Sequence, residues 1–345
     1  MALQNEEVGM TWETGHPWLP SVAVSRCVGD GTGYEQPRLT ANEVGSLAEF
    51  SADAIQFGFS VFEGMRAYIA DPTFLVFRAH DHHERLRASC AALALPCPAY
   101  DVFIEAIEQA VRANWNGRAT RLYVRPVVFA AGGDVMPRQS HKYVFVVLVK
   151  RFDPVLESMS VLVEESMPRT VPMFAAVKTA GNYTSAALAM QNARKAGCDT
   201  ILWLNGDGHL QECTTMNVFL CLDGQIVTPK LGSILPGVTR RTVLDLLAGM
   251  GERVVERDIR ISEVSDALAR EEGLSMFTTS TALGIHKVAR LRLGSGDHVL
   301  EGKVPSTWSR VEEQYSLVTE RFTEADGSYS AIMSRSHRGD VSRPS

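Results

Sequence analysis

The first part of the chain, from about residue 20 to 150, alternates between two hydrophobic periods. Runs rich in β-branched and aromatic residues predict strands, and they read VFEGMRAYI, TFLVFRA, RLYVRPVVFA and KYVFVVLVK. Between these runs, apolar residues recur at helical spacing over His80–Leu95 and Tyr100–Asn114. We therefore expect residues 1–150 to form a small α/β domain.

The second part of the chain begins after an Asp-Pro pair in RFDPVLES, which predicts an interdomain loop over residues 151–158. SVLVEES follows, and DTILWLNGDGHLQECTTMNVFLCLDGQIVTP then reads as three strand-like runs separated by NGDG and LDGQ hairpin turns. Helices are predicted from about Ser185 onward and over PGVTRRTVLDLLAGMG, which has Pro-Gly at its entry and Gly at its exit. We expect a larger domain over residues 159–325 and a polar, flexible tail over 326–345.

Composition and charge indicate a soluble globular protein without a nucleic-acid or membrane partner. The 345 residues are 45% hydrophobic and 21% charged, with a net charge of −6 and scattered basic residues. The longest apolar run, Tyr143–Val149, is far shorter than the ~20 residues that span a bilayer. The acidic N-terminus does not resemble a signal peptide, and the six cysteines form no CxxC pair. These features predict a cytoplasmic protein with reduced thiols.

Lys178 is a lone lysine that follows apolar residues and precedes a Gly-Asn-Tyr turn. In such surroundings a lysine is partly desolvated and nucleophilic, and it can form a Schiff base with a carbonyl compound or with pyridoxal phosphate. An ordinary lysine, whose stem lies over apolar surface while its amine reaches solvent, is the alternative. The local sequence leaves both interpretations open.

Two further segments have the residue types that bind a charged cofactor. Glu212 precedes the apolar run NVFL, so its carboxylate either needs a partner, such as a protonated pyridine nitrogen, or is an exposed strand glutamate. Pro236-Gly237 opens a helix whose first-turn N–H groups, with the hydroxyl of Thr239, can bind phosphate. Each signal is weak by itself because many helix starts and strand ends share it.

Five blocks in a fixed order give a more specific signal. The blocks are FGFSVFEGMRAY (Phe57–Tyr68), HERLRAS (His83–Ser89), KTAGNY (Lys178–Tyr183), QECTTMNVF (Gln211–Phe219) and LPGVTR (Leu235–Arg240). This series resembles the fold-type IV pyridoxal-phosphate enzymes and, within them, the branched-chain amino acid aminotransferases, over about residues 50–295. The resemblance implies a two-domain α/β homodimer, with a larger β-barrel-like C-terminal domain and pyridoxal 5'-phosphate at the domain interface. It also implies ping-pong transfer of an amino group from a branched-chain or related hydrophobic L-amino acid to 2-oxoglutarate.

The resemblance also implies roles at the reactive end of the cofactor. Lys178 would form the Schiff base and then move a proton between the substrate α-carbon and C4′ of the cofactor. Glu212 would pair with the pyridine nitrogen, and Tyr183 would hydrogen-bond the phenolic oxygen. Together these three residues would control the charge of the cofactor ring.

The phosphate and the substrate would bind to other matching residues. Arg85, Val238, Thr239 and Thr281 would hold the phosphate, with Arg85 binding it bidentately. Ala282 and Thr281 would bind the substrate carboxylate. The remaining matching residues are expected to face the substrate: Phe62, Tyr123 and Arg125.

Several positions depart from the family pattern and leave the substrate open. Phe57 stands where relatives carry a tyrosine, Met173 and Phe174 precede the lysine, and His286-Lys287 replaces a Ser/Thr-Pro pair. These changes suggest an altered pocket and, as an alternative, a specialised amino acid or keto acid from a biosynthetic pathway. Less favoured alternatives are a pyridoxal-phosphate lyase of the same fold, a D-amino acid transaminase and a non-enzymatic binding protein. No metal site is expected, although HDHH (residues 80–83) has ligand-type side chains.

Overall fold

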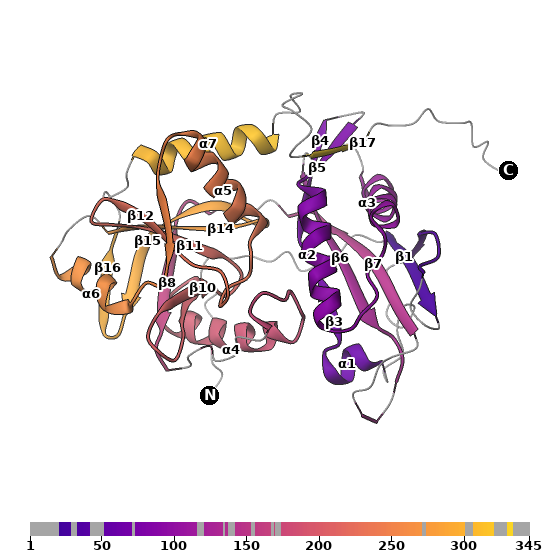
Figure 1. Cartoon of the computed structure of the whole chain (residues 1–345), viewed down its shortest axis with the longest axis horizontal. Coiled ribbons are helices and arrows are strands. Elements are labelled where there is room, and N and C mark those ends of the chain that lie inside the picture. Colours follow the sequence, from indigo (N-terminus) through magenta and orange to yellow (C-terminus); the bar gives the residue numbers. More distant parts are fainter. Residues whose placement is uncertain are drawn as a thin grey trace, which may run out of the picture.

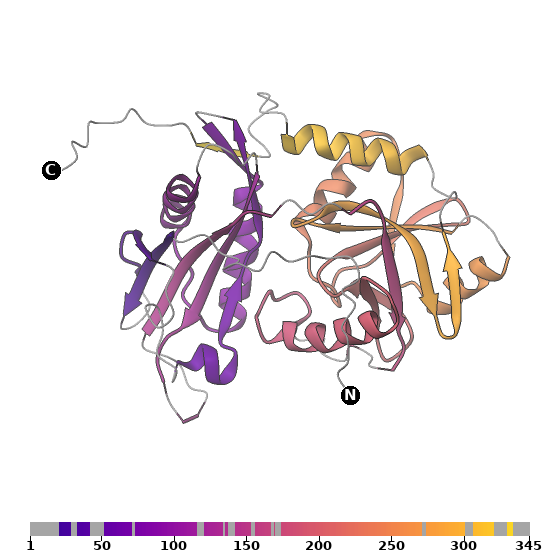
Figure 2. The same ribbon diagram turned by 180° about the vertical axis from the view of Figure 1, so that it is seen from behind.

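The chain is built around two β-sheets with helices packed on them. The structure, a computed structural model, describes residues 21–28, 33–41, 52–70, 73–115, 121–133, 135–136, 142–152, 156–166, 169, 174–270, 274–300, 306–320 and 330–333. Figure 1 shows the two sheets in separate lobes, with α2 on the side of the first lobe that is nearer to the second. The same arrangement is seen from behind in Figure 2.

The first lobe contains an antiparallel sheet in the order β17-β5-β4-β6-β7-β1-β2, with β3 also paired to β6. Its strands are β1 (Ser21–Val28), β2 (Arg38–Ala41), β3 (Ser60–Phe62), β4 (Met65–Ala70), β5 (Thr73–Phe77), β6 (Arg121–Ala130), β7 (Lys142–Lys150) and β17 (Ser330–Met333). Its helices are α1 (Asp53–Phe57), α2 (Ala79–Ala92) and α3 (Tyr100–Asn114). The bounds of α3 are those predicted from the hydrophobic period, and α2 ends three residues earlier than predicted.

The second lobe contains a mixed sheet in the order β10-β9-β8-β15-β14-β11-β12-β13, with β16 also paired to β15. Its strands are β8 (Met159–Glu164), β9 (Thr200–Leu204), β10 (Leu210–Cys213), β11 (Asn217–Leu222), β12 (Gln225–Pro229), β13 (Val254–Arg257), β14 (Ser275–Ser280), β15 (Gly284–Leu293) and β16 (Gly296–Val299). Its helices are α4 (Asn182–Lys195), α5 (Val238–Gly249), α6 (Ile261–Ala269) and α7 (Ser306–Glu320). The predicted domain boundaries and the loop at residues 151–158 stay a prediction, although the chain passes from one sheet to the other between β7 and β8.

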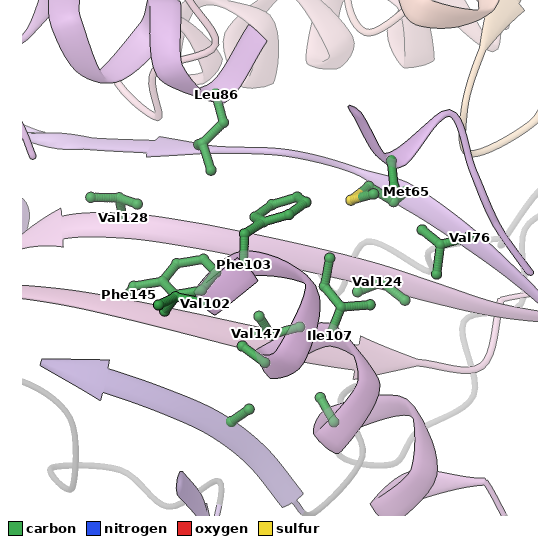
Figure 3. Close-up of a cluster of buried hydrophobic side chains, with 14 of the residues drawn as sticks. Met65, Val76, Leu86, Val102, Phe103, Ile107, Val124, Val128, Phe145 and Val147 are labelled. Atoms are coloured by element: carbon green, nitrogen blue, oxygen red, sulfur yellow. The ribbon is translucent and has the colours of Figure 1, made fainter. Parts of the chain in front are cut away.

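Each lobe has its own apolar core, and a third cluster joins the two lobes. In the first lobe, side chains of α2 and α3 pack on the sheet, as Figure 3 shows for Leu86, Phe103 and Phe145. The joining cluster combines Phe77 of β5 with Phe277 and Tyr315 of the second lobe. The rings of Phe77 and Tyr315 lie 6.2 Å apart, edge to face. This shared core fixes the lobes relative to each other.

Three sequence predictions about elements were wrong in detail. The run HLQECTTMNVFL is not one strand, because the chain turns at Thr214–Met216 and separates β10 from β11; Cys213 donates to the carbonyl of Met216 at 2.8 Å across this turn. Helix α4 begins at Asn182, three residues before the predicted start, which places Tyr183 in its first turn. In the predicted flexible tail, Ser330–Met333 forms β17 and pairs with β5. Among the helices of the described residues, none combines the length and apolar character needed to cross a membrane.

Candidate active site

A cavity of about 400 Å³ lies between the two sheets. It is lined by segments from both lobes, including the ends of β3 and β6, the first turns of α4 and α5, and the loop between β14 and β15. Every residue predicted for the site belongs to this lining: Phe62, Arg85, Tyr123, Arg125, Lys178, Tyr183, Glu212, Val238, Thr239, Thr281 and Ala282. Residues that are up to 220 positions apart in the sequence therefore face one space.

The backbone of Lys178 is fixed by contacts with the first lobe. Phe62 of β3 donates to the carbonyl of Lys178 at 3.0 Å, and Ala180 donates to the carbonyl of Ser60 at 3.0 Å. From the other side, the N–H of Lys178 donates to the hydroxyl of Ser89 on α2 at 3.1 Å. The lysine segment thus extends β3 as a short antiparallel pair, and this pairing holds Lys178 at the lobe interface.

The amine of Lys178 is positioned by aromatic side chains. Its Nζ donates a hydrogen bond to the hydroxyl of Tyr183 at 2.6 Å. It also lies 4.8 Å from the centre of the Phe62 ring and 5.2 Å from that of Tyr183. Because α4 starts at Asn182, Tyr183 is carried on the first turn, only five residues after the lysine. This arrangement holds the amine beside a phenol that can donate or accept a proton.

Glu212 lies at the end of β10 and is only 7% exposed. One carboxylate oxygen accepts a hydrogen bond from Arg169, and the other accepts from the side chain of Asn217 and the N–H of Leu235, both at 3.1 Å. Burial raises the pKa of Glu212, although Arg169 and the Leu235 N–H oppose this shift. The carboxyl group is therefore held by three donors in a place where a further cationic partner would favour its ionised form.

Arg85 projects from α2 toward the start of α5. Its Nε and Nη2 donate to Glu63 at 2.8 and 2.7 Å, and its Nη1 donates to the carbonyl of Pro236 at 3.0 Å. Glu63 is fully buried and also accepts from Nδ1 of His82 at 2.7 Å. Burial alone would raise the pKa of Glu63, but Arg85 and His82 outweigh it and lower the pKa to about 2. An ionised Glu63 therefore orients the guanidinium of Arg85.

The first turn of α5 forms another wall of the cavity. It presents the N–H groups of Val238 and Thr239, which have no acceptor within the helix because no helical carbonyl lies four residues before them. Gly237 precedes them, and a Cβ there would clash with the side-chain oxygen of Asn217. Thr239 is 3% exposed and lines the cavity. This turn can therefore receive an anionic group.

The loop after β14 is held by an arginine from the first lobe. The guanidinium of Arg66, on β4, donates to the carbonyls of Thr281 and Ala282 and to that of Phe152. It also lies over the Phe152 ring, 5.4 Å from its centre. Arg66 is 6% exposed. The two residues predicted to meet the substrate carboxylate are thus fixed across the lobe interface.

Tyr123 and Arg125 project from the same face of β6, because side chains two positions apart in a strand share a face. Arg125 donates to the hydroxyl of Tyr123 at 3.0 Å, and its guanidinium lies 4.9 Å from the centre of the Phe62 ring. Lys150 on β7 is directly opposite Tyr123 and also lines the cavity. Cations and aromatic rings therefore surround this end of the cavity.

Comparison with known proteins agrees with this geometry. Residues 60–291 match the family model described as amino-transferase class IV. A probable branched-chain-amino-acid aminotransferase of Staphylococcus epidermidis is 33% identical over 268 residues, which cover 74% of this chain and 75% of that protein. The chain belongs to the class IV aminotransferases, in the branched-chain aminotransferase family.

Solved structures show the same fold as this aminotransferase. The branched-chain aminotransferase of Thermoproteus uzoniensis, solved with norvaline, is 26% identical with a TM-score of 0.72, covering 86% of this chain and 95% of that one. The branched-chain amino acid aminotransferase of Thermobaculum terrenum, solved in its PLP form, is 22% identical with a TM-score of 0.72, covering 88% and 95%. The predicted α/β, fold-type IV architecture is therefore confirmed.

Sequence reasoning missed four charged residues around the cavity of this aminotransferase. Glu63 and Arg66 stand inside the first resemblance block, but their sequence positions give no indication that they are buried. Arg169 lies in an irregular segment, and Lys150 ends an apolar strand where a solvent-exposed lysine is the ordinary expectation. These residues are recognised as part of the site only from their contacts in the folded protein.

The predicted changes in the pocket wall are not found in the cavity lining. Phe57, Phe174, His286 and Lys287 are all described, and none of them is among the residues that line the cavity. Lys287 instead lies 3.9 Å from Glu312 of α7. Met173 lies outside the described residues. Within this chain these four described positions do not line the cavity, and their effect on the substrate stays a prediction.

Proposed function

We propose that this transaminase uses pyridoxal 5'-phosphate, bound to Lys178 as a Schiff base, to move an amino group from a branched-chain or related hydrophobic L-amino acid to 2-oxoglutarate by a ping-pong mechanism. The observation that carries the proposal is the 2.6 Å hydrogen bond between Lys178 Nζ and the Tyr183 hydroxyl, in a cavity that also holds Glu212 and Arg85. The PLP form of the Thermobaculum terrenum relative supports the choice of cofactor.

The residues around the cavity fit this cofactor in charge and hydrogen-bonding capacity. Arg85 has five N–H groups, and its bonds to Glu63 and Pro236 use three of them, which leaves two for a phosphate. Thr239 and the first turn of α5 supply further donors. Glu212 would hold the ring nitrogen and Tyr183 the phenolic oxygen. When bound, pyridoxal phosphate supplies an electron sink for the carbanion formed at the substrate α-carbon.

Lys178 is the base that this chain offers for the α-proton. Once its amine is free, Nζ would take the proton from the substrate α-carbon and deliver it to C4′ of the cofactor. The hydroxyl of Tyr183 and the rings around Nζ fix its direction. Thr281 and Ala282, held by Arg66, would bind the substrate carboxylate and so orient the α-carbon toward Nζ.

The lining supports a hydrophobic donor and a dicarboxylic acceptor. Apolar side chains form much of the wall: Phe62, Phe152, Ala175, Val177, Ala186, Trp203, Met216, Leu235, Ala282 and Leu283. Arg125 and Lys150 add positive charge on adjacent strands of the first lobe. A distal carboxylate of 2-oxoglutarate can pair with these cations, whereas a branched aliphatic side chain can pack on the apolar wall.

A single-turnover assay tests the proposal. The purified protein is loaded with pyridoxal phosphate and mixed with L-leucine, L-isoleucine or L-valine without a keto acid. We expect about one equivalent of the branched 2-oxo acid per bound cofactor, because a ping-pong half-reaction stops after one transfer. Addition of 2-oxoglutarate should then yield glutamate and allow further release of the branched 2-oxo acid.

Other outcomes discriminate the alternatives. If an amino donor other than leucine, isoleucine and valine is the only one that yields a 2-oxo acid, the specialised transaminase is favoured. If many equivalents of product form without an acceptor, the lyase is favoured. Absence of bound cofactor after reconstitution would refute the cofactor assignment. The predicted cytoplasmic location and homodimer are part of the proposal, and equilibrium sedimentation tests the dimer.

A further inference from the structure

A second group of reactive side chains lies outside the cavity, at the C-terminal end of α2. The chain reverses there: the N–H groups of Leu93 and Leu95 both donate to the carbonyl of Cys90, at 3.1 and 2.9 Å. Ala94 completes the reversal with a left-handed φ of 53°. This turn brings Cys97 back toward Cys90, seven residues earlier in the chain.

The two thiols and a histidine lie close together. Cys97 packs against the buried cluster that contains Cys90, and His83 Nε2 lies 4.0 Å from the Cys97 sulfur. His83 Nε2 also lies 2.9 Å from the carbonyl of Pro98, so it must carry a proton there. Arg87, on the same helix, adds positive charge. The donors from Cys90 and His83 outweigh burial and lower the pKa of the Cys97 thiol, whereas the pKa of Cys90 is raised.

Exposure distinguishes the two thiols from each other and from the three other cysteines whose side chains the structure describes. Cys97 is half-buried, whereas Cys90 is 1% exposed. Of the other described cysteines, Cys198, Cys213 and Cys221 are buried, and burial raises the pKa of each thiol. Cys97 therefore combines access to solvent with a stabilised thiolate, the two properties that make a cysteine reactive.

We propose that Cys97 and Cys90 form a redox-active dithiol, in which Cys97 reacts with a hydroperoxide and Cys90 then closes an intramolecular disulfide. This site is separate from the transaminase cavity and does not depend on the proposed function. His83, whose Nε2 lies 4.0 Å from the Cys97 sulfur, favours the attacking thiolate electrostatically.

The reaction balances as a two-electron oxidation of the dithiol by the peroxide. The Cys97 thiolate attacks one peroxide oxygen, the O–O bond breaks, and the departing oxygen takes up a proton and leaves as water or an alcohol. Cys97 is then a sulfenic acid. The sulfur of Cys90 attacks the sulfur of Cys97, the S–O bond breaks, and the hydroxyl leaves as water with the proton of the Cys90 thiol.

The first test measures thiol reactivity in the native full-length protein. Limited iodoacetamide is added over a range of pH, and peptide mass spectrometry gives the alkylation rate of each cysteine. We expect Cys97 to react at least about tenfold faster than Cys198 or Cys221 at neutral pH, because thiolate fraction and access both favour it. His83→Phe should lower the alkylation rate of Cys97 and leave the alkylation rate of Cys198 unchanged. Equal rates at Cys97 and Cys198 in the unaltered protein would overturn the proposal.

The second test follows oxidation. Hydrogen peroxide should produce a Cys90–Cys97 disulfide that dithiothreitol reverses. In Cys90→Ser, Cys97 should stop at the sulfenic acid and be trapped by dimedone, and Cys198→Ser should behave like the unaltered protein. Peroxide treatment that links Cys97 only to another molecule, or to no thiol, would refute Cys90 as its partner. The unaltered protein decides this point by peptide mapping if Cys90→Ser does not fold.

Discussion

Glu63 holds Arg85 through two parallel hydrogen bonds, from Nε at 2.8 Å and from Nη2 at 2.7 Å. Glu63 stands in the short break between β3 and β4 and is fully buried, and Arg85 projects from α2. The pair has low exposure, so solvent screens it weakly. Because Arg85 is the predicted phosphate ligand, Glu63 would position the cofactor without touching it.

Glu63→Gln should destabilise the protein by several kcal/mol at neutral pH, since removing one partner leaves the buried charge of Arg85 uncompensated, at a typical cost of about 3–5 kcal/mol. Urea unfolding of the two proteins measures this difference. The matched control is Glu84→Gln on α2. Glu84 pairs with the exposed Arg87, and loss of this surface ion pair should change the free energy of unfolding little. Equal effects of the two substitutions would contradict a structural role for the Glu63–Arg85 pair.

The same carboxyl predicts a pH dependence. The pKa of Glu63 is lowered from 4.5 to about 2, so its contribution to stability is fully present above pH 4.5 and is lost as the pH falls toward 2. At ~1.4 kcal/mol per pKa unit, this contribution is about 3 kcal/mol. The stability difference between the unaltered protein and Glu63→Gln should therefore shrink across this range. A difference that stays constant would show that Glu63 does not ionise there.

Lys178→Ala should abolish turnover, because no other described amine lies beside Tyr183 to accept the α-proton. We expect at least about a 10³-fold fall in kcat, larger than the usual effect of losing one general base because the covalent link is lost as well. Lys195→Ala, at the exposed end of α4, is the control. Transamination that is retained in Lys178→Ala would rule out the assigned role.

Lys150→Met should raise the KM for 2-oxoglutarate about tenfold, equal to about 1.4 kcal/mol of lost charge pairing. The KM for a monocarboxylic 2-oxo acid should change little, because it lacks the distal carboxylate. Lys142→Met, at the exposed start of the same strand, is the control. Equal changes for both acids would mean that Lys150 acts on general binding or folding and does not recognise the second carboxylate.

Arg66→Lys keeps the charge but loses the planar fork that reaches the carbonyls of Thr281 and Ala282. We expect the KM for the amino donor to rise about tenfold, while the affinity for pyridoxal phosphate changes less. Steady-state kinetics and cofactor titration separate the two effects. Arg310→Lys on α7 is the exposed control. If the affinity for pyridoxal phosphate falls as much as the affinity for the amino donor, Arg66 stabilises the lobe interface in general and does not act specifically on the substrate carboxylate site.

Most of the local elements and the residue types at the centre of the site could be predicted from the sequence. Helix α3 and strands β6 and β7 follow from the period of apolar residues, because each buries one face or both against the same core. Lys178, Glu212 and Arg85 stand in motifs whose order is specific, and all three line one cavity. Their chemical roles remain predictions that the experiments above test.

Which groups hold these residues depends on the packing of segments that are far apart in the sequence. Arg66 reaches carbonyls 215 and 216 positions away, and Arg169 meets Glu212 across 43 positions. A hydrophobic period shows which face of an element is buried, but it does not show which distant segment covers that face. A buried charge cannot be told from an exposed one by its place in the sequence. The pair Arg66–Ala282 joins the two lobes, whereas Glu63–Arg85 lies within the first lobe and Arg169–Glu212 within the second, so all three pairs depend on how distant segments pack.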